Sequence, residues 1–145
     1  MLCLPKAFCQ ITGISIEQML HEIGHDGSEI LWPELPEPLC RRAFHVQEII
    51  EVLLKHGHMV TPIEKYPSIQ PYNGREFVGD EAPLPPRDFG LYKDKVGVVI
   101  GIYNGVGHAF KWINGVLECP NGGSAFWVRF DARILYIVKT VSLTF

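Results

Sequence analysis

The fold is decided by residues 107–122, which read GHAFKWINGVLECPNG. Two short apolar runs flank Asn114 and Gly115, and Asn-Gly between such runs is the strongest short-range signal of a β-hairpin, because a type I′ turn needs positive φ at both central residues. Counting outward from the turn gives the opposed pairs Ile113–Val116, Trp112–Leu117, Phe110–Cys119 and His108–Asn121. Because opposed residues share a sheet face, the pattern predicts an imidazole held in one tautomer by the amide of Asn121.

The sequence around this hairpin reads as strands. Residues 96–103 form an almost continuous apolar run, which is typical of a central strand. We expect residues 104–107 to turn the chain into the hairpin strands 108–113 and 116–119. Residues 126–130 and 134–145 are then expected to complete the sheet.

The first third of the chain reads as helices. Three apolar stripes at helical spacing predict helices that begin near residues 3, 16 and 45, and Gly13, Gly24 and Gly57 end them. Ser15 and Gln18 match a capping box at the start of the second helix. A short strand is expected at 59–63. Because helices come first and strands follow, we predict a single α+β domain over residues 1–145, with N-terminal helices packed on a mostly antiparallel C-terminal sheet.

Two proline-rich segments interrupt this order. Residues 26–42 are expected to be a surface strap that is anchored by Ile30, Leu31 and Trp32 and touches substrate. Residues 67–87 are interpreted as an irregular excursion, in the manner of a flap.

Composition excludes several classes of protein. The chain has 145 residues, 47% of them hydrophobic, and a formal net charge of −3, so bulk charge attracts neither nucleic acid nor an anionic membrane. It has no apolar run of membrane-spanning length and no pattern typical of a secretory signal, which favours a cytoplasmic protein. The four cysteines are expected to be free thiols in that compartment. Nothing in the sequence fixes the oligomeric state.

The position of Cys3 at the start of the first helix favours a reactive thiol. Pro5 suits a first helical turn, so Cys3 lies at or next to the helix N-terminus. The helix dipole and the free N–H groups there favour a thiolate. Cys3 is therefore a candidate nucleophile.

The segment His21-Glu22-Ile23-Gly24-His25 matches the zinc-protease signature HExxH. A zinc site needs both histidines buried with a third ligand, for which Glu48 is a candidate. The apolar stripe of this helix instead predicts that both histidines face solvent. A zinc metallopeptidase using His21 and His25 therefore stays an alternative.

A Cys-x-Pro opening a helix, a Gly-His opening a central strand and a hairpin ending in Pro-Asn-Gly together resemble papain-like cysteine peptidases. The nearest branch is the peptidases that process double-glycine leader peptides of bacteriocins, and the resemblance covers residues 3–24 and 96–123. It implies a papain-like fold, with Cys3 as the nucleophile and His108 as the base.

The chain departs from that family's pattern in two places. Cys119-Pro120 stands where the branch has Asp-Pro, so Asn121 is expected to orient His108. The family's oxyanion glutamine, several residues before the cysteine, has no counterpart, and Gln47 and Asn104 are the candidate substitutes.

The sequence therefore predicts a cysteine-dependent hydrolase that cleaves a peptide or small amide through a thioester, without a cofactor. Besides the zinc enzyme, the remaining alternative is a catalytically inactive papain-like binding module.

Overall fold

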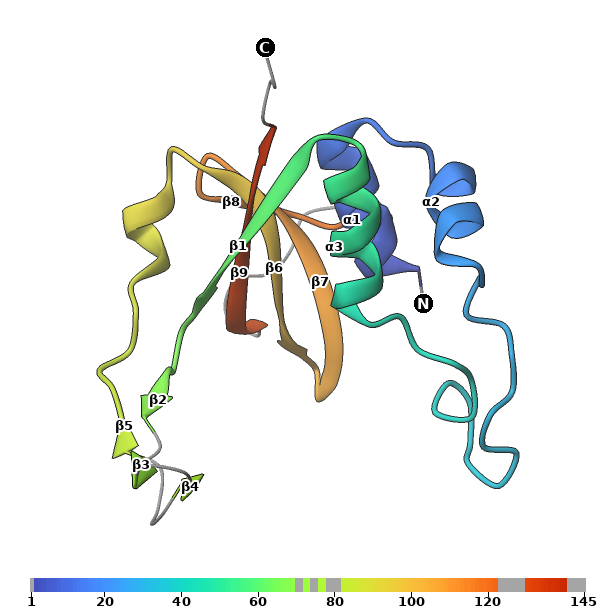
Figure 1. The fold of residues 1–145 in the computed structure, drawn as a ribbon, viewed down its shortest axis with the longest axis horizontal. Helices are drawn as coiled ribbons and strands as arrows, with labels where there is room; N and C mark the ends of the chain where they lie inside the picture. The colour runs from blue at the N-terminus through green and yellow to red at the C-terminus, as the bar shows by residue number, and fades with distance from the viewer. Residues whose placement is uncertain (1, 70–71, 74–75, 78–81, 123–129, 141–145) are drawn as a thin grey trace.

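A computed structural model describes residues 2–69, 72–73, 76–77, 82–122 and 130–140. Within these residues the chain is α+β, with helices α1, α2 and α3 beside a five-stranded antiparallel sheet (Figure 1). The predicted α+β class and the order of helices before strands are confirmed.

The helices begin and end where local chemistry stops them. They are α1 (Cys3–Thr12), α2 (Ile16–Ile23) and α3 (Val46–Lys55). Gly13 and Gly24 are left-handed caps with φ of 82° and 92°, which glycine adopts without steric cost. Ser15 Oγ accepts the Gln18 N–H as predicted, but the Gln18 amide donates to Glu22.

Helix α3 carries a capping box that the sequence pattern did not suggest. The ring of His45 accepts the Gln47 N–H, and the Glu48 carboxylate accepts the His45 N–H. Histidine is not among the usual N-cap residues, so a search for Ser, Thr, Asp or Asn misses this capping box, although the apolar stripe places the helix start correctly near residue 45.

The five strands lie in the order β1-β9-β6-β7-β8. They are β1 (His58–Glu64), β6 (Val96–Tyr103), β7 (Val106–Ile113), β8 (Val116–Glu118) and β9 (Phe130–Thr140). The expected break between residues 130 and 134 is wrong, because β9 runs through it as one strand. Residues 126–129 and 141–145 of the predicted strands lie outside the described part of the chain.

The hairpin turn is confirmed. Asn114 and Gly115 have φ of 52° and 79°, and Trp112 pairs with Leu117. A second two-residue turn at Asn104 and Gly105 brings β6 back into β7 two residues earlier than predicted.

Strands β6 and β9 approach so closely that two glycines are required. A Cβ atom at Gly97 would lie 2.1 Å from the Tyr136 carbonyl oxygen, and one at Gly101 would lie 2.1 Å from that of Asp131. The β6–β9 register shifts between Ile100 and Gly101, next to this approach.

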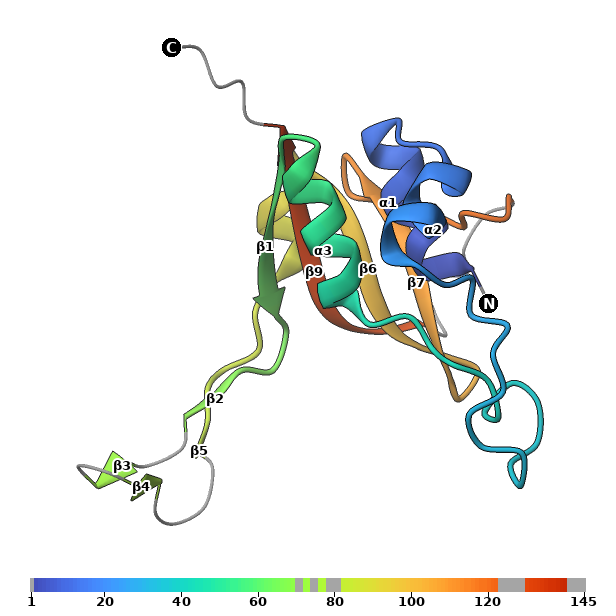
Figure 2. The same ribbon diagram turned by 45° about the vertical axis from the view of Figure 1, so that its right-hand side comes forward.

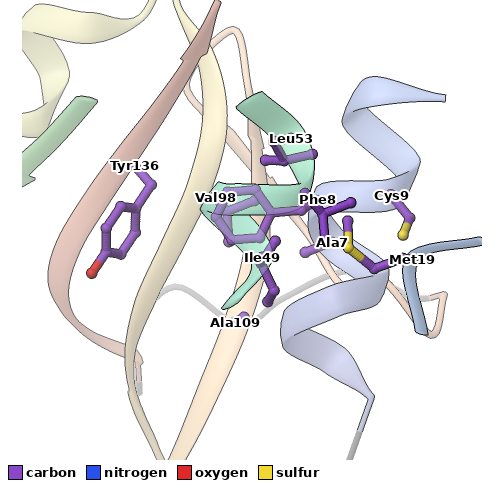
Figure 3. Close-up of a cluster of buried hydrophobic side chains, with 10 residues drawn as sticks. Ala7, Phe8, Cys9, Met19, Ile49, Leu53, Val98, Ala109 and Tyr136 are labelled. Atoms are coloured by element: carbon purple, nitrogen blue, oxygen red, sulfur yellow. The ribbon is translucent and has the colours of Figure 1, made fainter. Parts of the chain in front are cut away.

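Two apolar clusters cover the two faces of the sheet. On the helical face, Phe8, Met19, Ile49, Leu53 and Val98 are almost fully buried (Figure 3). On the other face, the 3₁₀ helix η1 (Phe89–Tyr92) packs Phe89 against Val99, Trp112 and Leu135. The alternation of β6 side chains supplies both clusters, because Val98 and Val99 point to opposite faces.

The strap at residues 26–42 is not anchored as predicted. Ile30, Leu31 and Trp32 are 53%, 43% and 46% exposed, whereas Cys40 is 5% exposed. The backbone N–H groups of Leu31 and Trp32 both donate to the Cys40 carbonyl. The strap is therefore held by its backbone and by Cys40.

The predicted excursion at 67–87 is a long arm whose described parts form two small ladders. Strand β2 (Ser68–Ile69) pairs with β5 (Ala82–Pro83), and β3 (Tyr72–Asn73) pairs with β4 (Glu76–Phe77). Both views show the arm leading away from the sheet (Figures 1 and 2). In the described residues, none of the helices has the length and apolar character that a membrane span needs.

Candidate active site

Cys3 and His108, more than one hundred residues apart in the sequence, line one cavity of about 370 Å³. The cavity lies where the start of α1 meets strands β6 and β7 and the segment 26–44. Its wall is completed by Leu2, Leu4, Asp26, Gly27, Pro38, Arg41, Arg42, Ala43, Phe44, Ile100, Gly107 and Ala109. Both predicted residues thus line one cavity, Cys3 from the helical face of the sheet. The His108 ring packs against Phe110 and Tyr103 of the cluster on the other face, and no hydrogen bond joins it to Cys3 within the described residues.

Cys3 is the first residue of α1 and is half-buried. Leu2, at the N-cap, provides no side-chain hydrogen bond, and the first backbone bond into the helix runs from the Lys6 N–H to the Leu2 carbonyl. The N–H groups of Cys3 and Leu4 precede that bond and have no intrahelical acceptor, and Pro5 has no N–H. Two donors are therefore left at the end of α1 that lines the cavity.

His108 lies within β7, opposite Gly101, rather than at the strand's first residue as predicted. Its ring meets Phe110 edge-on at 4.4 Å between centroids, with Tyr103 at 6.2 Å. Burial lowers the pKa of His108 below its ordinary value of 6.5. At neutral pH the imidazole is uncharged and able to accept a proton.

The side chain that faces His108 is Cys119. The Cys119 Sγ and His108 Nε2 atoms are 3.8 Å apart, whereas the Asn121 Oδ1 atom accepts a hydrogen bond from Lys6 Nζ at 3.2 Å. The predicted pairing of His108 with Asn121 is therefore not formed.

A turn explains this departure from the hairpin register. The β7–β8 ladder ends at the pair Lys111–Glu118, and the Gly122 N–H then donates to the Cys119 carbonyl at 3.0 Å. The turn lies against α1, where Gln10 Nε2 donates to the Pro120 carbonyl. Pro120 is the signal that the residue count overlooked, since proline has no N–H for a ladder and Pro-Asn-Gly is turn chemistry.

Neither predicted oxyanion donor lines the cavity. Gln47 is exposed in the first turn of α3, and Asn104 is exposed in the β6–β7 turn. The N–H groups of Cys3 and Leu4 are better placed donors.

Two arginines of the strap form part of the cavity wall and were not singled out from the sequence. Arg41 Nη2 lies 2.8 Å from Glu37 Oε1, and its Nη1 donates to the Ser28 carbonyl at 2.6 Å. Arg42 is held more loosely, with 3.4 Å to Glu29. Adjacent cations in a proline-rich loop are the only hint the sequence offers of this wall.

The two histidines of the HExxH match have different environments. His21 is exposed on α2, while His25 lies beyond Gly24 and thus outside the helix. The pattern requires both histidines on one helical face, so the local structure does not provide the expected geometry.

His25 is part of an interior network, against the prediction that it faces solvent. Its side chain is 6% exposed and stacks on Phe44 at 4.7 Å, and Phe44 is part of the cavity wall. His25 Nδ1 accepts the Gly27 N–H at 3.1 Å, and Nε2 lies 3.0 Å from Glu48 Oε2. Both ring nitrogens are thus occupied within the chain.

Glu48 is the charged member of that network. Burial alone would raise its pKa, but hydrogen bonds from the His45 N–H and from His25 lower it below the ordinary value. Among the described residues, no three His, Cys, Asp or Glu side chains are arranged to hold a metal ion.

Comparison with family models, with curated proteins and with solved structures found no match to this chain. The resemblance to papain-like peptidases therefore rests on the chain's own residues, and the family stays a proposal.

Proposed function

We propose that the chain is a papain-like, cysteine-dependent hydrolase in which Cys3 is the nucleophile and His108 is the general base. The observation that carries this proposal is the shared cavity of Cys3 and His108. A thiol at a helix start and an uncharged imidazole are the two groups that thiol catalysis requires.

The proposed reaction begins when His108 takes the Cys3 thiol proton and the sulfur attacks a carbonyl carbon. The negative oxygen of the tetrahedral intermediate accepts hydrogen bonds from the Cys3 and Leu4 N–H groups. His108 then gives the proton to the leaving nitrogen, the carbon–nitrogen bond breaks and a thioester remains. Water attacks the thioester while His108 accepts its proton, and that proton returns to the departing sulfur.

In this scheme Cys119 takes the orienting role that the sequence assigned to Asn121. If the His108 Nε2–H donates to the Cys119 sulfur, the Nδ1 atom is the free acceptor for the Cys3 proton. Sulfur is a weak acceptor, so Cys119 fixes the tautomer less firmly than a carboxylate would.

The wall favours a substrate with apolar groups beside the scissile bond. Leu2, Leu4, Phe44, Ile100 and Ala109 contribute apolar side chains to it. A peptide or small amide with such groups is the proposed substrate class.

The test is the rate at which each cysteine reacts with iodoacetamide between pH 5 and 9, measured by mass spectrometry. We expect Cys3 to react fastest, and to lose its advantage in His108→Ala but keep it in the control His21→Ala. Cys9 and Cys40 should react slowly, because both are buried and burial raises the pKa of Cys9 to about 11. Equal rates for Cys3 in the wild type and His108→Ala would overturn the proposal.

Chelation separates the zinc alternative from this proposal. The thiol enzyme should keep its Cys3 reactivity in the presence of a chelator, whereas the zinc enzyme should carry stoichiometric metal and lose its activity. A chain with neither a reactive Cys3 nor bound metal would fit the inactive binding module.

A further inference from the structure

We propose that a second cavity, on the sheet face opposite α1 and α3, binds a small organic anion with an apolar body. This cavity has a volume of about 390 Å³, within the size range of small-molecule sites. Its wall comes from η1, the base of the arm, β6, the β7–β8 hairpin and β9. The lining residues are Lys65, Arg87, Asp88, Phe89, Gly90, Lys93, Val99, Trp112, Gly115, Leu117, Phe130 and Ala132.

This second cavity is separate from the one that contains Cys3. Val99 lines it, while its neighbour Ile100 lines the Cys3 cavity, and successive residues of a strand point to opposite faces. Figure 1 shows η1 on the other side of the sheet from the helices. The sheet therefore divides the two sites.

Charge around the second cavity is unbalanced. Lys65, Arg87 and Lys93 contribute three positive charges, and Asp88 contributes one negative charge, which leaves two positive charges. The Asp88 carboxylate already accepts the Gly90 N–H at 2.8 Å. This local excess stands out in a chain whose net charge is −3.

Three nearby carboxylates form salt bridges with residues that do not line the cavity. Salt bridges join Asp94 to Lys95, Asp131 to Arg133, and Glu118 to Lys111. In the described part of the chain, no carboxylate lies within salt-bridge distance of Lys65, Arg87 or Lys93; Lys65 lies 5.7 Å from the Tyr66 ring. An anion entering the cavity thus meets three cations, none of which forms a salt bridge with a described carboxylate.

The rest of the wall is apolar. Val99, Leu117, Phe130 and Ala132 contribute carbon, and Trp112 adds an indole ring whose N–H donates to the Tyr92 carbonyl at 2.9 Å. That bond fixes the ring against η1. A cavity that combines cations with a rigid aromatic and aliphatic wall favours a ligand with a negatively charged end and an apolar body.

The probe is 1-anilinonaphthalene-8-sulfonate, with N-phenyl-1-naphthylamine as the matched neutral compound that lacks only the sulfonate. We expect the sulfonate to bind once per chain, more tightly than the neutral compound and more weakly as salt rises. Two-dimensional NMR should show the largest amide shifts at Gly90 and Gly115. Equal affinity for the two compounds, or shifts confined to the strap at 26–42, would overturn the proposal.

Charge variants sharpen the test. Arg87→Glu should weaken binding of the sulfonate by about tenfold, because it removes a cation and adds an anion. Lys55→Glu, an exposed charge change on α3, should leave the affinity unchanged, and so should Cys3→Ser. If Arg87→Glu and Lys55→Glu lowered the affinity for the sulfonate equally, the binding would depend only on the overall charge of the chain, and the proposed site would be refuted.

Competition identifies the anionic group. Inorganic phosphate, adenosine monophosphate and octanoate should be tested separately for displacement of the sulfonate. Displacement by the monophosphate or by octanoate would support the site and assign its head group as phosphate or carboxylate. If none of the three displaces the probe, the proposed ligand class is wrong.

Discussion

The Nε2 atom of His108 lies 3.8 Å from the Sγ atom of Cys119, so a thiol faces the second nitrogen of the imidazole. The papain-like pattern that this chain resembles has an aspartate at the position of Cys119. A neutral thiol stabilises an imidazolium far less than a carboxylate does, and burial also favours the uncharged ring. Under the proposed function, His108 therefore acts as a neutral base rather than as a preformed cation.

Replacing Cys119 with aspartate should strengthen the base. A carboxylate beside Nε2 raises the pKa of His108 and stabilises the imidazolium that forms during attack. We expect Cys119→Asp to increase the labelling rate of Cys3 at pH 7 by about tenfold, since one pKa unit corresponds to that factor. Cys119→Ala should lower the rate by a smaller factor.

Asn121 provides the matched comparison for that change. Because its side chain bonds to Lys6 rather than to His108, Asn121→Ala should leave the labelling rate of Cys3 close to that of the wild type. If Asn121→Ala lowered the labelling rate of Cys3 more than Cys119→Ala does, the result would support Asn121 as the partner of His108, as the hairpin register predicted.

The pH dependence of the proposed reaction should reflect the buried imidazole. Because its pKa is lowered, His108 is mostly in its neutral, proton-accepting form at pH 6.5, where an ordinary histidine is half-charged. The acid limb of kcat/KM, or of Cys3 labelling, should therefore have its midpoint below pH 6.5 and move upward in Cys119→Asp. A midpoint above pH 6.5 in the wild type would contradict the neutral-base mechanism.

His25 should contribute to the stability of the folded chain, whereas His21, the other histidine of the HExxH match, should not. His25→Ala removes the ring on Phe44 and leaves the Gly27 N–H and Glu48 without their partner, for an expected loss of about 2–3 kcal/mol in the free energy of unfolding. The exposed His21→Ala should change that free energy by no more than about 0.5 kcal/mol. Urea unfolding at pH 7 measures both.

The contribution of this pair should also depend on pH. Because the folded-state pKa of Glu48 is lowered, its stabilisation is present above the ordinary carboxyl pKa of 4.5 and is lost as pH falls through the folded value. The difference between the wild type and His25→Ala should shrink in acid, and a constant difference from pH 7 to pH 3 would exclude an ionic role for Glu48.

Two glycines that flank the candidate site should respond differently to alanine. Gly101→Ala places a Cβ atom 2.1 Å from the Asp131 carbonyl oxygen, so β6 and β9 must separate, at a cost of about 1–3 kcal/mol. Gly107→Ala meets no atom within 4 Å and should be tolerated. Thermal unfolding of the two variants, with the β6–β9 amide exchange rates, tests this contrast; similar melting temperatures would contradict it.

Local patterns in the sequence were enough to predict most of the framework. The Asn-Gly turn, the glycine caps and the apolar stripes of α1 and α3 are determined by neighbouring residues, and the structure has them. The presence of Cys3 and His108 in one cavity also follows the prediction, because a helix start and a central strand meet there.

Features that depend on distant contacts were missed. His25 is buried only because Phe44 and Glu48, from another part of the chain, cover it, and helical periodicity contains no information about them. The partner of His108 was assigned by extending a register beyond the point where Pro120 ends it. Trp32 was expected to be an anchor because it is apolar, but large apolar residues are often exposed.

Strand β9 follows β1 and β6 in the chain and yet lies between them. During synthesis on the ribosome, the edges of β1 and β6 that pair with β9 therefore have no partner strand until residues 130–140 emerge. His58 and Thr140 are paired at one end of the β1–β9 ladder, and they can pair only after every strand of the sheet has been translated. Contacts of such long range make folding slow, so the cavity of Cys3 and His108 should acquire its final walls only after residues 130–140 have emerged, which would delay the proposed activity until β9 has paired with β1 and β6.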